Sequence, residues 1–185
     1  MFNANPKTLQ RIAPKIERVL IVDANPYQAK LLAELCRELG SRQIMTAHRS
    51  DQAMTITAEF KPDLIFTEYS APNLDGIEFT KALRRSPLDA RKAPVVMVTA
   101  EATAASIVAA RNSGVHEFLR KPFTAGDLFR RIENVALKPR LWIEAQMYVG
   151  PDRRRFNSED YGGAKKRNAD KGAAAPPAEA QAKAG

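Results

Sequence analysis

The sequence of 185 residues contains one cysteine, few aromatic residues (7%) and no long hydrophobic run. A lone Cys36 excludes an intramolecular disulfide, and the leucines around it at helical spacing predict a small core residue. No segment approaches the roughly 20 apolar residues of a membrane-spanning helix. The first 17 residues lack the apolar core of a secretion signal, so we expect a cytoplasmic protein. His48 and His116 lack a second His or Cys at metal-ligand spacing, so no metal site is predicted.

Positive charge is concentrated near the carboxyl end. The net charge is +8. Much of it comes from a short region that follows the last apolar segment: Arg153, Arg154, Arg155, Lys165, Lys166, Arg167 and Lys171. Such a cluster indicates an anionic partner, such as a nucleic acid, a nucleotide or a membrane surface. The alternative is a solvated, disordered tail.

Strand-like and helix-like patterns alternate between Arg18 and Leu137. Apolar, β-branched runs predict strands at Arg18–Asp23, Gln43–Ala47, Leu64–Glu68, Ala93–Ala100 and Glu117–Arg120. Apolar spacing, Pro, Gly and capping residues predict helices from Asn25-Pro26 to Gly40 and at Ser50–Glu59, Gly76–Arg85, Glu101–Ser113 and Thr124–Leu137. Five strands alternating with five helices predict an α/β fold with a doubly wound (βα)5 parallel sheet.

The pattern divides the chain into four parts. Residues 1–17 are expected to be a loose polar leader with a short helical turn, and residues 18–138 form the α/β domain. Residues 139–171 predict an arginine-rich extension without a fixed fold, with helix as the candidate structure up to Tyr148. Trp142 and Met147 are either an apolar lid or a partner anchor. Residues 172–185 are low in complexity and are expected to be disordered.

Polar residues follow the predicted strands at the edge where doubly wound sheets carry their chemistry. Asp23, Glu68 and Thr99 end three strands, and Lys121 follows the fifth, before Pro122. A cis peptide bond before Pro122 would aim the lysine inward. Carboxylates, a hydroxyl and an ammonium around one point are what phosphoryl transfer to a carboxylate requires.

Four motifs, VLIVDANP, PDLIFTEYSAPNLDG, VVMVTA and FLRKPF, carry a family resemblance. In this order they resemble the receiver domains of bacterial two-component response regulators, the CheY-like fold, over about Arg18 to Leu137. The resemblance implies that Asp23 is the first acid of the acidic pair and Thr99 the switch hydroxyl. It also implies that Lys121 is the invariant lysine and Phe118 the aromatic switch residue.

Two positions depart from the family pattern. The second acid of the pair is Ala24, which has no oxygen to give a metal ion, and the phosphoacceptor aspartate is replaced by Glu68. Glutamate places its carboxylate about 1.5 Å further out, where transfer is much slower. We therefore expect a degenerate, non-phosphorylated receiver that is not an enzyme, with Glu68 paired to Lys121. A phosphate-accepting response regulator remains the alternative.

The basic extension is the other candidate site. Arginines bind phosphates and the O6/N7 edge of guanine, aromatic rings stack on bases, and glycines let the chain wrap a compact ligand. With the receiver, the extension resembles the CheY-like cyclic di-GMP effector (Cle) family of flagellated bacteria such as the caulobacters, most specifically in YVGPDRRRF. The resemblance implies cyclic di-GMP as ligand, bound by residues among Tyr148, Gly150, Pro151, Asp152, Arg153, Arg154, Arg155, Phe156, Asn157, Ser158, Asp160, Tyr161, Lys165, Lys166 and Arg167.

The same resemblance implies a protein partner, and other interpretations of the tail stay open beside it. It implies docking on the flagellar motor switch through the face of the fourth helix, fifth strand and fifth helix, which includes Ala104–Ala110, Phe118 and Thr124–Val135. Such docking would tune motility or surface attachment. A nucleic-acid-binding tail is a less favoured alternative, and a merely solubilising tail is another. A PilZ domain is excluded because too few residues remain for its β-barrel.

Overall fold

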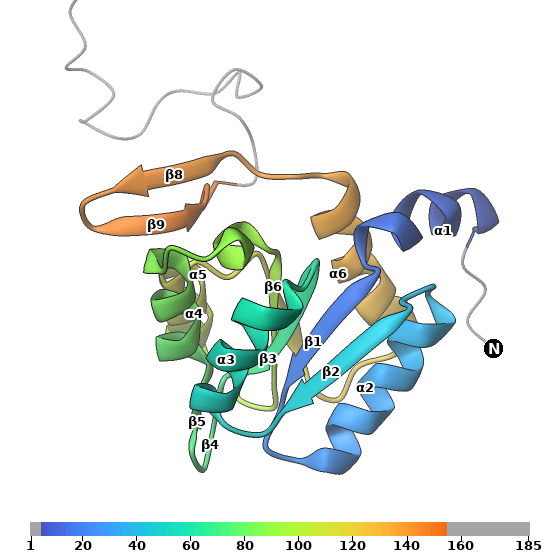
Figure 1. Cartoon of the computed structure of the whole chain (residues 1–185), viewed down its shortest axis with the longest axis horizontal. Coiled ribbons are helices and arrows are strands. Elements are labelled where there is room, and N and C mark those ends of the chain that lie inside the picture. The colour runs from blue at the N-terminus through green and yellow to red at the C-terminus, as the bar shows by residue number, and fades with distance from the viewer. Residues whose placement is uncertain (1–4, 155–185) are drawn as a thin grey trace, which may run out of the picture. The chain divides into compact units, whose positions relative to one another are not determined.

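A computed structural model describes residues 5–154 of the chain. Its centre is a five-stranded parallel sheet in the order β2-β1-β3-β6-β7 (Figure 1). The strands are β1 (Arg18–Val22), β2 (Gln43–Ala47), β3 (Leu64–Glu68), β6 (Val95–Thr99) and β7 (Glu117–Arg120). The predicted doubly wound α/β fold is confirmed.

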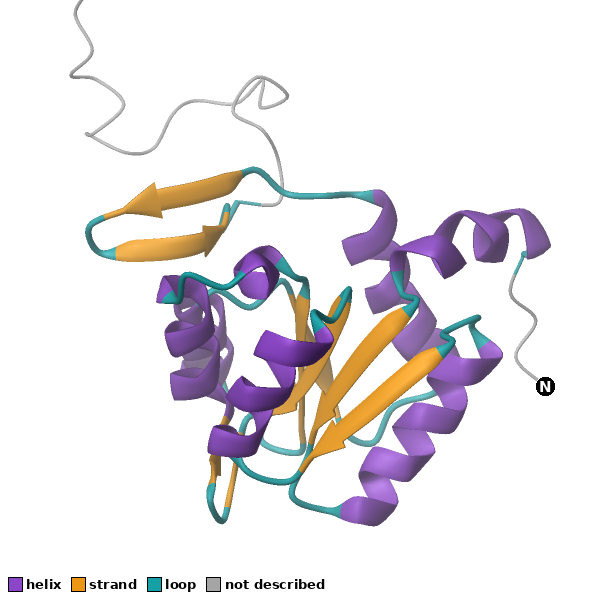
Figure 2. Ribbon diagram, in the orientation of Figure 1, coloured by secondary structure: helices purple, strands orange, loops and turns teal. Residues whose placement is uncertain are grey.

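Helices cover both faces of the sheet (Figure 2). The cluster on one face combines α1 (Pro6–Ile12), α2 (Pro26–Glu38) and α6 (Ala125–Leu137) with the strands. The cluster on the other face combines α3 (Ser50–Phe60), α4 (Gly76–Arg85) and α5 (Ala104–Ser113). The 3-10 turns η1 (Ala13–Lys15) and η2 (Asp89–Lys92), and the short pair β4 (Ser70–Ala71) and β5 (Leu74–Asp75), complete this part of the fold.

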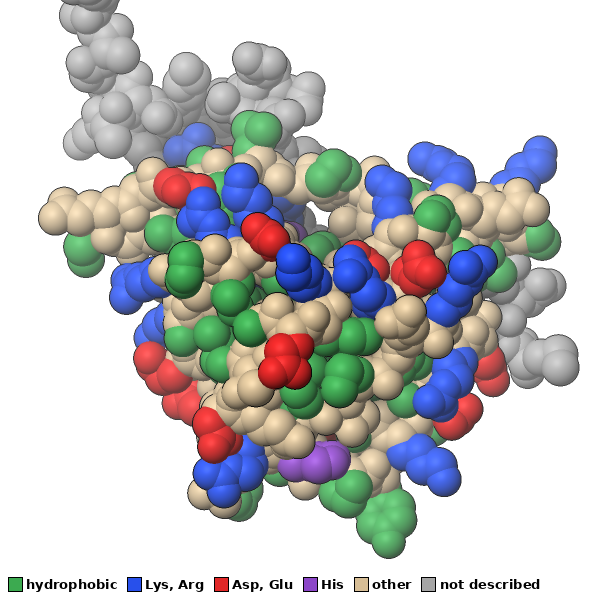
Figure 3. Space-filling model, viewed as in Figure 1, with side chains coloured by type: hydrophobic (Ala, Val, Ile, Leu, Met, Phe, Trp, Pro, Cys, Tyr) green, Lys and Arg blue, Asp and Glu red, His purple; other side chains and the backbone are tan. Residues whose placement is uncertain are grey.

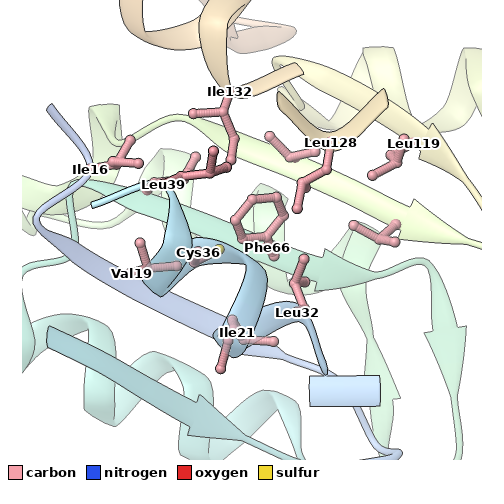
Figure 4. Packing of buried hydrophobic residues seen from close by; sticks show 14 of the residues in the cluster. Ile16, Val19, Ile21, Leu32, Cys36, Leu39, Phe66, Leu119, Leu128 and Ile132 are labelled. Atoms are coloured by element: carbon pink, nitrogen blue, oxygen red, sulfur yellow. The ribbon is translucent and has the colours of Figure 1, made fainter. Parts of the chain in front are cut away.

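Each strand supplies both cores because successive side chains point to opposite faces of a sheet. In β1, Val19 and Ile21 belong to the cluster under α2 and α6, whereas Leu20 and Val22 belong to the other. Figure 4 shows the first cluster, with Phe66 among the side chains of β1, α2 and α6. Cys36 is fully buried there, as predicted.

The helix starts follow their capping residues. The Asn25 side chain accepts from the N–H groups of Tyr27 and Gln28, and Thr124 forms the predicted capping box with Asp127. Helix α5 begins at Ala104 rather than at the predicted Glu101, because the Thr103 hydroxyl caps it. The starts at Asn25 and Thr124 were therefore predicted from their caps, whereas the cap at Thr103 was missed.

The amino-terminal segment was wrongly expected to be a loose leader. Helix α1 packs on α6, and Ile12 and Ile16 are 0% and 1% exposed. Leu9 and Ile12 lie one turn apart on α1, Ile16 follows the 3-10 turn η1, and all three side chains join the core cluster. The packed domain therefore begins before Arg18.

The first part of the extension, residues 139–154, was wrongly expected to lack a fixed fold or to be helical; the rest of the extension lies outside the described residues. Strands β8 (Trp142–Ala145) and β9 (Tyr148–Pro151) form an antiparallel hairpin that packs on α4 and α5. Ala145 pairs with Tyr148, which leaves a two-residue loop, the commonest hairpin connection. Trp142 faces the domain as a lid, whereas Met147 at the loop is 88% exposed.

Within residues 5–154, no helix is long and apolar enough to cross a membrane. The predicted disordered segment, residues 172–185, lies outside the described residues.

Candidate functional site

A crevice lies at the carboxyl ends of the parallel strands. Asp23 follows β1 directly, Glu68 ends the neighbouring β3, and Lys121 follows β7 directly. The Lys121-Pro122 peptide bond is cis, as predicted. The three charged side chains are 10%, 12% and 17% exposed, in that order. Burial at this level strengthens their attraction relative to a surface ion pair.

The ammonium group of Lys121 is the centre of this cluster. Its Nζ lies 3.1 Å from Oδ2 of Asp23 and also donates to Oε2 of Glu68 and Oε1 of Gln28. A lysine has three N–H donors, so these three acceptors use all of them. The predicted pairing of Glu68 with Lys121 is confirmed.

Backbone groups hold the outer carboxylate oxygens. Oδ1 of Asp23 accepts from the Asn25 N–H at 2.8 Å, and Oε1 of Glu68 accepts from the Tyr69 N–H at 2.9 Å. Every carboxylate oxygen of the pair therefore has a donor within the protein. The two carboxylates and the ammonium therefore form a fully hydrogen-bonded ion-pair network.

The residues of this crevice do not fit a divalent cation. Magnesium needs near-octahedral oxygen ligation. Ala24 lines the crevice without an oxygen in its side chain, and the Lys121 ammonium already lies between the two carboxylates. Among residues 5–154, no group of three or more His, Cys, Asp or Glu side chains is arranged to hold a metal ion.

The crevice opens into a cleft of about 640 Å³ that also contains residues that sequence reasoning missed. Gln28 supplies the third acceptor of Lys121, and Nδ1 of His48 lies 2.8 Å from the Asp23 carbonyl oxygen. The signal for Gln28 was present in NPYQ, because the third residue of a helix that starts beside a strand end lies over that end.

Thr99 and Phe118 occupy the neighbouring strands β6 and β7. The Thr99 hydroxyl accepts from the Glu101 N–H at 3.1 Å, and its carbonyl accepts from the Lys121 N–H at 2.7 Å. Phe118 is half-buried against the cluster under α3, α4 and α5. The side-chain network around Lys121 thus joins Asp23, Glu68 and Gln28, while Thr99 bonds to its own loop.

Sequence comparison agrees with this fold. The model of the response regulator receiver domain matches residues 19–133. The chain belongs to the response regulator receiver family.

This receiver is similar to known chemotaxis proteins. A probable chemotaxis protein CheY of Rhizobium etli is 36% identical over 124 residues, which is 67% of this chain and 95% of the relative. Chemotaxis protein CheY of Pseudomonas aeruginosa is 31% identical over 118 residues, 64% of this chain and 94% of the relative.

Solved structures show the same fold. A putative response regulator from Chloroflexus aurantiacus has a TM-score of 0.61 at 25% identity, over 66% of this chain and 98% of its own. Chemotaxis protein CheY4 of Vibrio cholerae has a TM-score of 0.60 at 24% identity, over 65% and 98%.

The receiver carries its extension as a docked element, which changes the expected role of Tyr148. This residue was predicted to offer an open face for base stacking, but it is only 8% exposed, and its hydroxyl donates to the Pro151 carbonyl oxygen at 2.6 Å. The guanidinium of Arg153 lies 4.7 Å from the centre of its ring and donates to Oδ1 of Asn112 on α5 at 3.0 Å. Tyr148 therefore supports Arg153 instead of facing solvent.

Gly150, Pro151 and Asp152 also contribute to docking. Gly150 has φ of +155°, and a Cβ there would lie 2.9 Å from the Cα of Gly114, so glycine permits the close approach of β9 to the end of α5. Pro151 is buried, and the Asp152 N–H donates to the Leu141 carbonyl oxygen at 2.7 Å. Arg153 and Arg154 are exposed. The other predicted ligand residues lie outside the described residues: Arg155, Phe156, Asn157, Ser158, Asp160, Tyr161, Lys165, Lys166 and Arg167.

A buried arginine lies beneath the hairpin. Arg84 is 1% exposed and donates to three main-chain carbonyl oxygens, those of Gly114 (3.0 Å), Arg91 (2.6 Å) and Ala93 (2.9 Å). Its guanidinium lies 5.4 Å from the centre of the Trp142 ring. Burial lowers the pKa of Arg84 to about 9, so it stays charged at neutral pH.

His116 makes the stability of this region depend on pH. Its Nδ1 accepts from the Val95 N–H at 3.2 Å and lies 3.3 Å from Nη2 of Arg84. Burial, and then the charges of Arg84 and Arg140, hold the pKa of His116 well below 6.5. Below pH 6.5 the unfolded chain takes up a proton that the folded chain does not, so stability falls as the pH drops.

We expect the free energy of unfolding to fall by about 1 kcal/mol between pH 7 and pH 5.5 through this residue alone. Urea unfolding across that range measures it. The variant His116→Asn, whose amide oxygen can still accept, should lose this part of the pH dependence, whereas His48→Asn should keep it. Equal pH dependence in the wild type and His116→Asn would contradict the assignment.

Proposed function

We propose that this receiver does not signal through phosphorylation. It binds cyclic di-GMP through its arginine-rich segment and then docks on a cytoplasmic partner, the flagellar motor switch, to tune motility or surface attachment. The observation that carries the proposal is the position of the Lys121 ammonium, which bonds both Asp23 and Glu68. A crevice closed in this way needs another input, and the basic segment supplies it.

The charge and position of the segment support a nucleotide ligand. Its first arginines, Arg153 and Arg154, are exposed where the docked hairpin ends. Lys and Arg side chains also gather around the hairpin edge of the face in Figure 3, interspersed with a few acidic ones. Guanidinium groups recognise phosphate and guanine edges bidentately. The choice of cyclic di-GMP among anions comes from the resemblance of YVGPDRRRF to the cyclic di-GMP effectors.

The proposed partner face consists of α5, β7 and α6. Ile107 and Val108 on α5 are each 44% exposed and are neighbours, so they offer apolar surface to a partner. The similarity to two chemotaxis proteins supports a partner in motility. Because β9 packs on α5, ligand bound next to the hairpin lies close to the element that would meet the partner.

Replacing Arg153, Arg154 and Arg155 together by alanine is expected to weaken cyclic di-GMP binding at least about 100-fold, since each hydrogen bond to a charged group contributes roughly 1.5–3 kcal/mol. The fold should survive, because Arg153 and Arg154 are exposed. Calorimetric titration of the full chain with cyclic di-GMP measures the loss.

The matched control replaces three other exposed arginines, Arg37, Arg42 and Arg49, by alanine, and so removes the same charge outside the segment. This triple variant should bind as the wild type does. GTP and a random oligonucleotide are the competing ligands. If the oligonucleotide binds more tightly, with the steep salt dependence of a polyanion, the segment binds nucleic acid and the cyclic di-GMP proposal is wrong.

A further inference from the structure

Two contacts fix the Arg153 side chain where the hairpin ends, one with Tyr148 and one with Asn112. The Arg153 guanidinium lies over the Tyr148 ring with 4.7 Å to its centre, and one edge is fixed by the 3.0 Å hydrogen bond to Asn112. Arg153 itself is exposed. The Tyr148 ring therefore lies against the guanidinium of an arginine that is exposed to solvent.

We propose that these three residues form a preformed stacking platform for one guanine base of the cyclic dinucleotide. The inference rests on the function proposed above and assigns a part of the ligand to a particular place on the receiver. Arg153 contacts the base, Tyr148 supports its underside, and Asn112 is a positioning residue on α5. Bases stack on arginine planes as they do on aromatic rings.

The geometry favours a base over a phosphate at this position. A phosphate takes the edge of a guanidinium, and here Asn112 already occupies one donor of that edge. A purine is planar and can stack on a guanidinium plane without using its edge. An arginine held by Tyr148 and Asn112 before binding also loses less side-chain freedom when the ligand arrives.

The platform is rigid because Tyr148, which supports it, belongs to strand β9 of the docked hairpin. The Tyr148 hydroxyl is bonded to Pro151, and the Gly150–Gly114 contact holds β9 against the end of α5. Burial raises the pKa of Tyr148, so the ring remains a neutral phenol under ordinary conditions. A base stacked here would be attached to α5, the first helix of the proposed partner face.

Two variants separate stacking from simple charge attraction. Arg153→Lys keeps the charge but removes the plane, and we expect affinity for cyclic di-GMP to fall about 5- to 150-fold, the range measured for loss of a base-stacking partner. Asn112→Ala keeps Arg153 but removes the hydrogen bond that positions it, and we expect the affinity for cyclic di-GMP to fall about 2- to 10-fold. Asn134→Ala, on helix α6, is the matched control and should bind normally.

Calorimetry of the full chain at two salt concentrations gives the readout, with thermal melting to verify the fold. The platform predicts weaker binding by Arg153→Lys with an unchanged salt slope, because the number of charged contacts is the same. Wild-type affinity in both Arg153→Lys and Asn112→Ala would overturn the platform and leave the proposed function intact. Absence of saturable cyclic di-GMP binding by the wild type would overturn the proposed function, and the platform with it.

Discussion

Replacing Arg84 by alanine is expected to lower the free energy of unfolding by about 3–5 kcal/mol. The substitution removes the donors to the Gly114, Arg91 and Ala93 carbonyl oxygens and leaves a cavity where a fully buried side chain had been. These carbonyl groups lie beneath the hairpin and cannot all regain water. In a chain of this size the melting temperature should fall by roughly 10 °C.

The neighbouring arginine provides the control for this experiment. Arg85 is exposed on the same last turn of α4, so Arg85→Ala removes the same charge and should change stability by no more than about 0.5 kcal/mol. Urea unfolding of both variants gives the comparison. The chain has a single tryptophan, Trp142, so its emission should shift to the red in Arg84→Ala if the hairpin loosens. Equal stability of the two variants would contradict the role given to Arg84.

The comparison of Arg84 with Arg85 shows where sequence reasoning reaches its limit. In KALRRS the two arginines look equivalent, and only the helical phase shared with Thr80 and Leu83 places Arg84 on the buried face. What makes that burial tolerable lies elsewhere in the chain, in carbonyl groups up to 30 residues away. A sequence pattern records burial of apolar residues well, but it does not record acceptors supplied by the main chain.

The hairpin was missed for a similar reason. The segment WIEAQMYVGP is short, and its apolar and polar residues alternate imperfectly. Its loop residues, Gln146 and Met147, are not the Asn-Gly or Asp-Gly pair that is typical of a two-residue hairpin loop. Its stability depends on distant contacts, such as Trp142 over Arg84, Gly150 against Gly114, and the Arg91–Glu144 ion pair at 2.8 Å. By contrast, the sheet and the Glu68–Lys121 pair were predictable, because parallel strands bring their carboxyl ends together whatever the loops do.

Placing aspartate at positions 24 and 68, as the family pattern has it, should allow the crevice to accept a phosphoryl group. Incubated with acetyl phosphate and Mg²⁺, the wild type is expected to gain no phosphoryl mass, whereas the double variant Ala24→Asp/Glu68→Asp should be labelled. The first substitution supplies a second carboxylate beside Asp23, and the second withdraws the carboxylate from Lys121 by one methylene. A misplacement of about 1 Å alone slows such a transfer by roughly 10²-fold. Intact-mass spectrometry measures the product.

The single variants show which change matters more. Glu68→Asp alone corrects the nucleophile but leaves Ala24 without an oxygen, and Ala24→Asp alone leaves Glu68 bonded to Lys121, so each should be labelled far more slowly than the double variant. Adding Lys121→Met to the double variant should abolish labelling again, because the ammonium then no longer stabilises the phosphoryl oxygens. Stoichiometric labelling of the wild type would show that Glu68 accepts phosphate despite its ion pair, and the proposal that this receiver does not signal through phosphorylation would be wrong.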